Sequence, residues 1–238
     1  LQYEEIFRLI TPKTKAMIVN TPSNPTGAVF DETSLKHVAE IALENDLIVI
    51  SDEAYEAITY DGFRHISLAS LSEMKSRTIS VFSLSKTYAM TGWRIGYALA
   101  NPEITRQMIK LQEHLTAHPS SISQTAAVAA LNGSKGTTDA MVKEYSERKE
   151  LVVEELKGVQ GIECFTPQGA FYVFPRIKSF NLCSDSFAIK LLEKARVVVV
   201  SGTAFGDHGE GHVRISYATS KDKIRQAMQR IRNSIGDL

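Results

Sequence analysis

Short apolar runs alternate with amphipathic stretches along the first hundred residues. The run at 47–50 is continuous, which is typical of a strand buried on both faces of a parallel sheet. The runs at 16–19 and 78–82 are also expected to form strands, the first of them buried. From 32 to 45 apolar residues recur with helical spacing, and Asp31 is placed to cap that helix. Strand, helix and strand in this order predict a βαβ unit, and so an α/β sheet.

The pattern changes beyond residue 100. Pro102 opens a long amphipathic helix, and the turn-forming residues at 132–136 are the clearest linker in the chain. We therefore expect a larger region, 1–135, and a smaller α+β region, 136–238. A mixed, mainly helical connection is expected over 56–76. In the smaller region we expect strands at 162–165, 170–174, 197–200 and 213–217, and helices at 184–195 and 220–235.

Polar residues that can carry chemistry follow the predicted strands. Asn24 lies in a turn-rich segment after the first strand, Asp52 directly follows the second, and Lys86 follows the third. Open α/β sheets bind ligands at the carboxyl ends of their strands. Burial favours a neutral lysine, and a neutral lysine forms Schiff bases with carbonyl cofactors such as pyridoxal phosphate. The simpler interpretations are a plain loop for Asn24, a helix cap for Asp52 and a surface lysine for Lys86.

Arg214 lies within an apolar run, where it either faces solvent or points into a cleft and binds a carboxylate. His114 and His118 are four residues apart, as zinc ligands can be, but no acidic third ligand is in register, so we predict no metal site. Cys164 and Cys183 lack metal-ligand spacing and are expected to be small core residues, which makes a reducing cytoplasm the default location.

Composition narrows the range of partners. The 238 residues contain 27 basic and 27 acidic side chains, so the formal net charge is zero, and no basic excess points to nucleic acid or to an anionic membrane. No apolar run approaches the roughly 20 residues that span a bilayer. We therefore expect neither a nucleic acid nor a membrane as a partner.

Taken together, the motifs resemble those of the fold-type I pyridoxal-phosphate enzymes, specifically the class I/II aminotransferases. The ordered set comprises Asn-Pro-Thr-Gly at 24–27, Asp52 with Tyr55, Ser-Leu-Ser-Lys at 83–86, Gly-Trp-Arg-Ile-Gly at 92–96 and His-Val-Arg-Ile-Ser at 212–216. Each motif alone is weak, but five in this order are specific. The likeness extends from about residue 16 to the end. It implies a fold-type I large domain with a central, mostly parallel sheet, and a small α+β domain that closes over the substrate.

The resemblance also implies a role for each residue. Lys86 would hold pyridoxal phosphate covalently and then move a proton as general base and acid. Asp52 would pair with the pyridine nitrogen. The remaining assignments are Asn24 and Tyr55 at the phenolic oxygen of the cofactor, Ser83, Ser85 and Arg94 at its phosphate, and Arg214, together with Asn24, at the substrate α-carboxylate. The implied reaction is a ping-pong transfer of an amino group between an α-amino acid and a 2-oxo acid.

Two stretches refine the resemblance. Met-Thr-Gly-Trp-Arg-Ile-Gly-Tyr at 90–97 and Gly-Ala-Phe-Tyr at 169–172 look most like the prokaryotic aspartate and aromatic aminotransferase branch. Members of the family usually form homodimers. Their N-terminal portion, with a glycine-rich phosphate turn and a ring stacked on the cofactor, has no counterpart in residues 1–15. We therefore expect this chain to work with a missing N-terminal portion, and to bind cofactor poorly without it.

Two other functions fit the same motifs. A pyridoxal-phosphate-dependent β-C–S lyase would use the cofactor to release pyruvate and ammonia. An aminotransferase-like effector domain of a transcription regulator would bind cofactor and ligand without turnover. Product analysis separates the lyase from the aminotransferase, and a turnover assay separates both enzymes from the regulator.

Overall fold

A computed structural model describes residues 2–237 of the chain. By the contacts within it, the chain forms two compact units. The first contains residues 2–22 and Val29–Thr138, and the second contains Ser23–Ala28 and residues 139–237. The division at residue 135 remains a prediction about independently folding domains. The short segment 23–28 belongs to the second unit although it lies early in the sequence.

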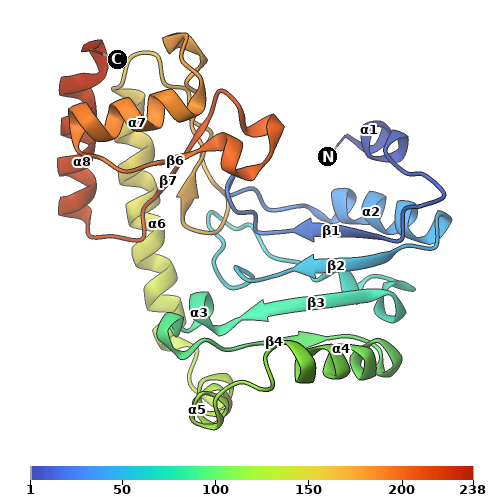
Figure 1. Ribbon diagram of the computed structural model, residues 1–238. Coiled ribbons are helices and arrows are strands. Elements are labelled where there is room, and N and C mark those ends of the chain that lie inside the picture. Colours follow the sequence, from blue (N-terminus) through green and yellow to red (C-terminus); the bar gives the residue numbers. More distant parts are fainter. Residues whose placement is uncertain (1, 238) are drawn as a thin grey trace. The chain divides into compact units, whose positions relative to one another are not determined.

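The first unit is built on a four-stranded sheet, β1 (Ala16–Asn20), β2 (Ile48–Asp52), β3 (Thr78–Ser83) and β4 (Gly96–Leu99), in that order. The first three strands are parallel and β4 is antiparallel to β3. Figure 1 shows the arrowheads of β1, β2 and β3 on the same side of the sheet, where α3 (Leu84–Thr87) follows β3 directly. The predicted α/β class and mostly parallel sheet are confirmed.

One face of this sheet is packed and the other is open. Helix α2 (Glu32–Glu44) starts at Asp31, whose Oδ1 accepts a hydrogen bond of 2.8 Å from the Ser34 amide, as predicted. Its apolar side packs with β1 and β2 in a buried cluster that includes Val19 and Val49. Ile18, however, is 75% exposed, so the expectation of a buried strand at 16–19 is wrong for this residue. Ile48 and Ile50 of β2 are only half-buried, so the expectation that the run at 47–50 is buried on both faces is also wrong.

Further helices of the first unit are α1 (Tyr3–Arg8), α4 (Pro102–Leu115) and α5 (Ser121–Asn132), and α6 (Gly136–Lys157) begins in this unit and continues into the second. The mainly helical connection expected over 56–76 is wrong. Only two short 3₁₀ turns form there, at Leu68–Ser70 and Met74–Ser76. Asp61 and Gly62 both have positive φ, +54° and +81°, which turns the chain and prevents a continuous helix.

The second unit contains a three-stranded antiparallel sheet in the order β5 (Tyr172–Val173), β7 (Val213–Ser216), β6 (Val200–Ser201). It also contains α7 (Ser184–Ala195), α8 (Lys221–Ser234) and most of α6. Strands β5 and β7 and the two helices lie where the sequence predicts them, although both strands are shorter than expected. β6 shares only Val200 with the strand expected over 197–200. Within the described residues none of the helices has the length and apolar character needed to cross a membrane.

Two expectations for the second unit are wrong. No strand forms over 162–165, where only Glu163 makes an isolated bridge to Arg176. Phe165 is 90% exposed, so the last residue of this run does not pack into the core. Cys183 is not a core residue, because it is exposed at the position that precedes α7. Cys164 is partly buried, and both cysteines are free thiols.

The segment 23–28 is held in the second unit by its backbone. The carbonyl of Gly27 accepts two hydrogen bonds of 2.8 Å, from the amides of Gln168 and Gly169. Gly27 has φ of +71°, and a Cβ at this position would lie only 2.4 Å from the Cβ of Pro167. Glycine is therefore required both by the backbone conformation and by the close approach of the two segments.

Candidate functional site

Asp52 and Tyr55 lie at the carboxyl end of β2. The carbonyl of Asp52 accepts hydrogen bonds of 3.2 Å from the Thr21 amide and from the Asn20 side chain, which ties the end of β2 to the end of β1. Its carboxylate Oδ1 accepts a bond of 3.2 Å from the Ala54 amide. This contact starts the turn that contains Tyr55, which is only 4% exposed. Asp52 itself is half-buried.

Lys86 lies at the end of the neighbouring strand, in the single turn of α3 that follows β3. Its Nζ lies 5.9 Å from the centroid of the Tyr55 ring, and its side chain is half-buried. The two strands β2 and β3 are paired in parallel, so their carboxyl ends bring an amine and a phenol together. The interpretation of Lys86 as an exposed loop residue is wrong.

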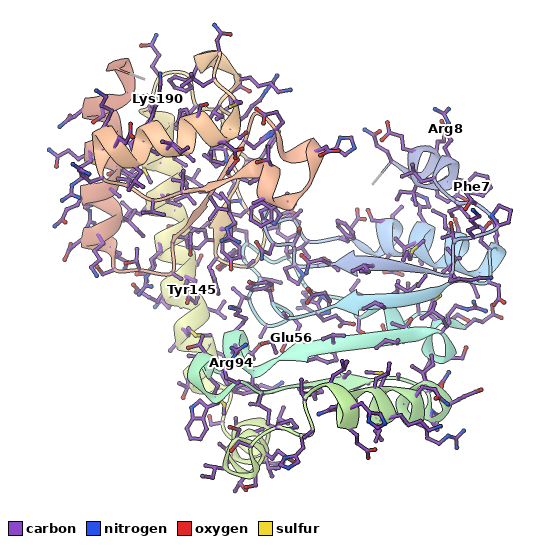
Figure 2. All side chains as sticks on the ribbon, viewed as in Figure 1. Phe7, Arg8, Glu56, Arg94, Tyr145 and Lys190 are labelled. Carbon is purple, nitrogen blue, oxygen red and sulfur yellow. The ribbon has the colours of Figure 1, made fainter. Side chains whose placement is uncertain are left out.

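The three residues predicted to bind phosphate lie in the same unit. Ser83 ends β3, Ser85 is buried in α3, and Arg94 follows a short 3₁₀ turn. Arg94 has positive φ, +49°, and its Nη1 donates a hydrogen bond of 3.1 Å to the carbonyl of Thr91. Figure 2 shows its side chain next to α3. Its guanidinium is exposed, and phosphate binding by these three residues stays a prediction.

Arg214 and Asn24 come together in the second unit. Arg214 is on β7, and its Nη1 donates a hydrogen bond of 2.8 Å to Oδ1 of Asn24, 190 positions away in the sequence. Its guanidinium carbon lies 4.5 Å from the ring centroid of Tyr172 and 4.9 Å from that of Phe205. Within the described residues, its buried Nε has no hydrogen-bond partner. A planar cation held between two rings, with a buried donor still unpaired, suits a carboxylate ligand.

Sequence reasoning missed the two rings beside Arg214. Tyr172 is part of the Gly-Ala-Phe-Tyr stretch, which was used only to refine the resemblance. Phe205 lies in a 3₁₀ turn after β6 and is marked by no motif. Tyr172 lies on β5 opposite Ser216 of β7, two residues from Arg214. Residues in this diagonal relation on antiparallel strands share a face and interact.

A buried carboxylate next to Asp52 anchors the end of β2. Glu53 is fully buried, and its two oxygens accept hydrogen bonds from Nε2 of His65, at 2.6 Å, and from the hydroxyl of Ser67, at 2.9 Å. Burial alone would raise the pKa of Glu53. Hydrogen bonds from His65, Ser80 and Ser67, with electrostatic attraction to His65, nevertheless bring this pKa below its ordinary value.

Replacing Glu53 by glutamine is expected to lower the free energy of unfolding at pH 7 by about 2 kcal/mol, since hydrogen bonds to a charged group are lost. The folded-state pKa lies below that of unfolded glutamate, about 4.3. The contribution is therefore fully present above pH about 4.3 and is lost as the pH falls through the folded-state pKa. Urea unfolding of both proteins between pH 7 and pH 3 measures the difference.

The matched control for this prediction is Glu163→Gln, because Glu163 is exposed and its ion pair with Arg176 is also exposed. It should leave the free energy of unfolding unchanged at every pH. A Glu53→Gln difference that stays constant down to pH 3 would show that the Glu53 pKa is not lowered by folding.

Comparison with known proteins places these features in a family. A sequence model of the aminotransferase class I and II family matches residues 1–231. The chain is 44% identical over 233 residues to aromatic-amino-acid aminotransferase 2 of Thermococcus litoralis, covering 97% of this chain and 60% of that protein. It is 46% identical over 233 residues to the aspartate aminotransferase of Pyrococcus abyssi, with the same coverage.

Solved structures give the same result. The crystal structure of an aromatic aminotransferase from Pyrococcus horikoshii superposes with a TM-score of 0.96 at 45% identity, over 100% of this chain and 64% of that one. The aspartate aminotransferase from Rhizobium meliloti gives 0.94 at 38% identity, over 99% of this chain and 62% of that one. The fold-type I architecture expected from the motifs is confirmed. The chain spans about 60% of the length of the relatives that it matches.

Proposed function

Because the chain belongs to the aminotransferase class I and II family, we propose that it takes part in pyridoxal-phosphate-dependent transfer of an amino group between an α-amino acid and a 2-oxo acid. The observation that carries this proposal is the pairing of Lys86 and Tyr55 at the ends of two parallel strands, 5.9 Å from amine to ring, beside Asp52. The names of the relatives, aspartate and aromatic aminotransferases, favour an aspartate-like or aromatic amino acid.

The residues of the first unit fit the chemistry of the cofactor. Pyridoxal phosphate supplies an aldehyde that condenses with an amine and a pyridine ring that withdraws electrons. Lys86 offers the amine, Asp52 a carboxylate that can hold the ring nitrogen in its protonated form, and Tyr55 a phenol that can donate to the phenolic oxygen. Ser83, Ser85 and Arg94 offer the hydroxyls and the cation that a phosphate needs.

Each residue then has one task in the reaction. Lys86 Nζ takes a proton from the substrate Cα and delivers one to C4′ of the cofactor. It therefore acts as general base and then as general acid. Arg214 binds the substrate α-carboxylate through the donors that Asn24 does not occupy, and Asn24 also contributes to the phenolic oxygen. The same site accepts the amino acid first and the 2-oxo acid second, which gives ping-pong kinetics.

We also propose that the chain acts with a companion N-terminal portion and within a homodimer. In support, every residue of β4 is exposed, including Leu99 at 59% exposure, as is Ile18 on β1. Apolar surface of this kind is typical of regions that another segment covers. The relatives are also longer than this chain. We place the protein in the cytoplasm, as expected of a chain whose two cysteines are thiols.

One experiment tests these proposals together. The purified chain is incubated with pyridoxal phosphate, L-aspartate or L-phenylalanine and 2-oxoglutarate, and the products are identified by mass spectrometry. Slow formation of glutamate and of the matching 2-oxo acid is expected. In a parallel incubation with a cysteine conjugate, formation of pyruvate and ammonia would identify a lyase. Bound ligand without product in either incubation would favour a regulator. Turnover by the chain alone at a rate typical of enzymes, about 10 per second, would contradict the need for a companion portion.

A further inference from the structure

Two residues outside the proposed machinery, Glu56 and Thr87, join the segments that carry Tyr55 and Lys86. Glu56 directly follows Tyr55, and Thr87 directly follows Lys86. The hydroxyl of Thr87 donates a hydrogen bond of 2.8 Å to Oε1 of Glu56. Thr87 is only 5% exposed, and Figure 2 shows Glu56 beside α3. This contact links the turn after β2 to the helical turn after β3.

Helix α3 needs such a link, because it contains only four residues. So short a helix is unstable by itself, and its orientation depends on the contacts that it makes. A second polar group of Thr87 also holds α3, since the Thr87 carbonyl accepts a hydrogen bond of 3.2 Å from the hydroxyl of Thr138. We propose that the hydrogen bond between Thr87 and Glu56 positions Lys86 relative to Tyr55. Thr87 and Glu56 are then positioning residues for the cofactor site.

The surroundings of Glu56 support this role. Its second oxygen, Oε2, is buried and has no hydrogen-bond partner within the described residues. Burial raises the pKa of Glu56, although the bond from Thr87 and the proximity of His65 lower it, and Glu53 raises it further. Burial and Glu56 in turn raise the pKa of Tyr97 on β4. An unpaired buried carboxyl oxygen costs folding free energy. Within the described residues, the side-chain hydrogen bond that Glu56 does form goes to Thr87, the residue after Lys86.

The inference rests on the proposed role of Lys86, so its test measures Lys86 in two ways. In the first, the chain is incubated with pyridoxal phosphate and reduced with borohydride, and the label at Lys86 is compared with that at the exposed Lys110 of α4. In the second, which uses no cofactor, acetic anhydride competes for the same two amines over a range of pH. Both ratios come from peptide mass spectrometry of one protein sample.

Thr87→Val keeps the shape of the side chain and removes the hydroxyl. It is expected to lower the label ratio at Lys86 about fivefold and to change the acetylation ratio. Thr87→Ser should restore both. Thr105→Val is the matched control, because it removes a threonine hydroxyl that donates a bond of 2.9 Å to the carbonyl of Asn101, just before α4, and it should leave both ratios at their wild-type values. Glu56→Leu and Glu56→Gln repeat the test from the other partner. The leucine variant should resemble Thr87→Val, whereas the glutamine variant keeps an acceptor oxygen and should resemble wild type.

The outcomes separate the two claims. If the wild-type protein carried the label on other lysines but not on Lys86, the proposed function would be overturned. Wild-type label at Lys86, with unchanged label and acetylation ratios in both Thr87→Val and Glu56→Leu, would overturn the positioning role alone. A loss in these two variants that serine at 87 and glutamine at 56 reverse would establish it, because each of these residues restores the hydrogen-bonding group and not merely the size of the side chain.

Discussion

Replacing Lys86 by alanine is expected to remove all phosphopyridoxyl label from its peptide after borohydride reduction, and to lower any amino transfer by about 10⁴-fold. The reason is chemical, since Lys86 is the amine at the end of β3 beside Tyr55 and is proposed both to hold the cofactor and to move the proton. Lys86→Arg should behave in the same way, because a guanidinium stays protonated and forms no Schiff base. Peptide mapping of both variants measures the label.

The control for this prediction is Lys110→Ala, on the exposed side of α4. It should leave the label at Lys86 and the rate of transfer unchanged. If the label in the Lys86→Ala protein moved to another lysine without loss of transfer, Lys86 would not be the residue that holds the cofactor. Label on other lysines but not on Lys86 in the unaltered chain would lead to the same conclusion.

Replacing Arg214 by lysine is expected to weaken binding of a 2-oxo acid by about 10- to 100-fold, the loss associated with hydrogen bonds to a charged partner. Lysine keeps the positive charge but loses the planar fork that binds a carboxylate through two parallel bonds. It also loses the contacts of the guanidinium with the rings of Tyr172 and Phe205. An NMR titration with 2-oxoglutarate that follows the ring protons of these two residues measures the dissociation constant.

Arg225→Lys serves as the control for the charge itself. Arg225 is an exposed arginine of α8 that pairs with Asp222, and its replacement should not alter the titration. An equal dissociation constant for the Arg214→Lys protein and the unaltered chain would remove Arg214 from the proposed substrate site. Asn24→Ala should have a smaller effect than Arg214→Lys, because it removes one neutral partner of the guanidinium.

Much of the first unit follows from local sequence. The continuous apolar runs locate β2 and β3, and Asp31 marks the start of α2. The ends of the apolar runs also mark the carboxyl ends of β2 and β3. For this reason Asp52 and Lys86 could be assigned to one edge of the sheet before the fold was known. The physical reason is that the backbone periodicity of helices and strands is expressed over a few neighbouring residues.

The errors arose where distant segments decide the outcome. Apolar stretches at 16–19 and 162–165 have strand-like sequences, but burial of the first and pairing of the second depend on which surfaces lie opposite them. The Asp61-Gly62 turn interrupts the connection at 56–76, where a mixed, mainly helical structure was expected. Cys183 is exposed although the next residue, Ser184, is fully buried, and the local sequence does not distinguish the two.

The sequence by itself determined the α/β class, the family and the identity of the residues that can carry the chemistry, because each of these is recorded in residue types and their order. Only the tertiary structure decided that Asn24 joins Arg214 in the second unit, that Tyr172 and Phe205 enclose the guanidinium, and that Thr87 bonds to Glu56. The Thr87–Glu56 and Asn24–Arg214 contacts connect residues that are 31 and 190 positions apart. Side chains so distant are brought together by packing, which no local pattern encodes.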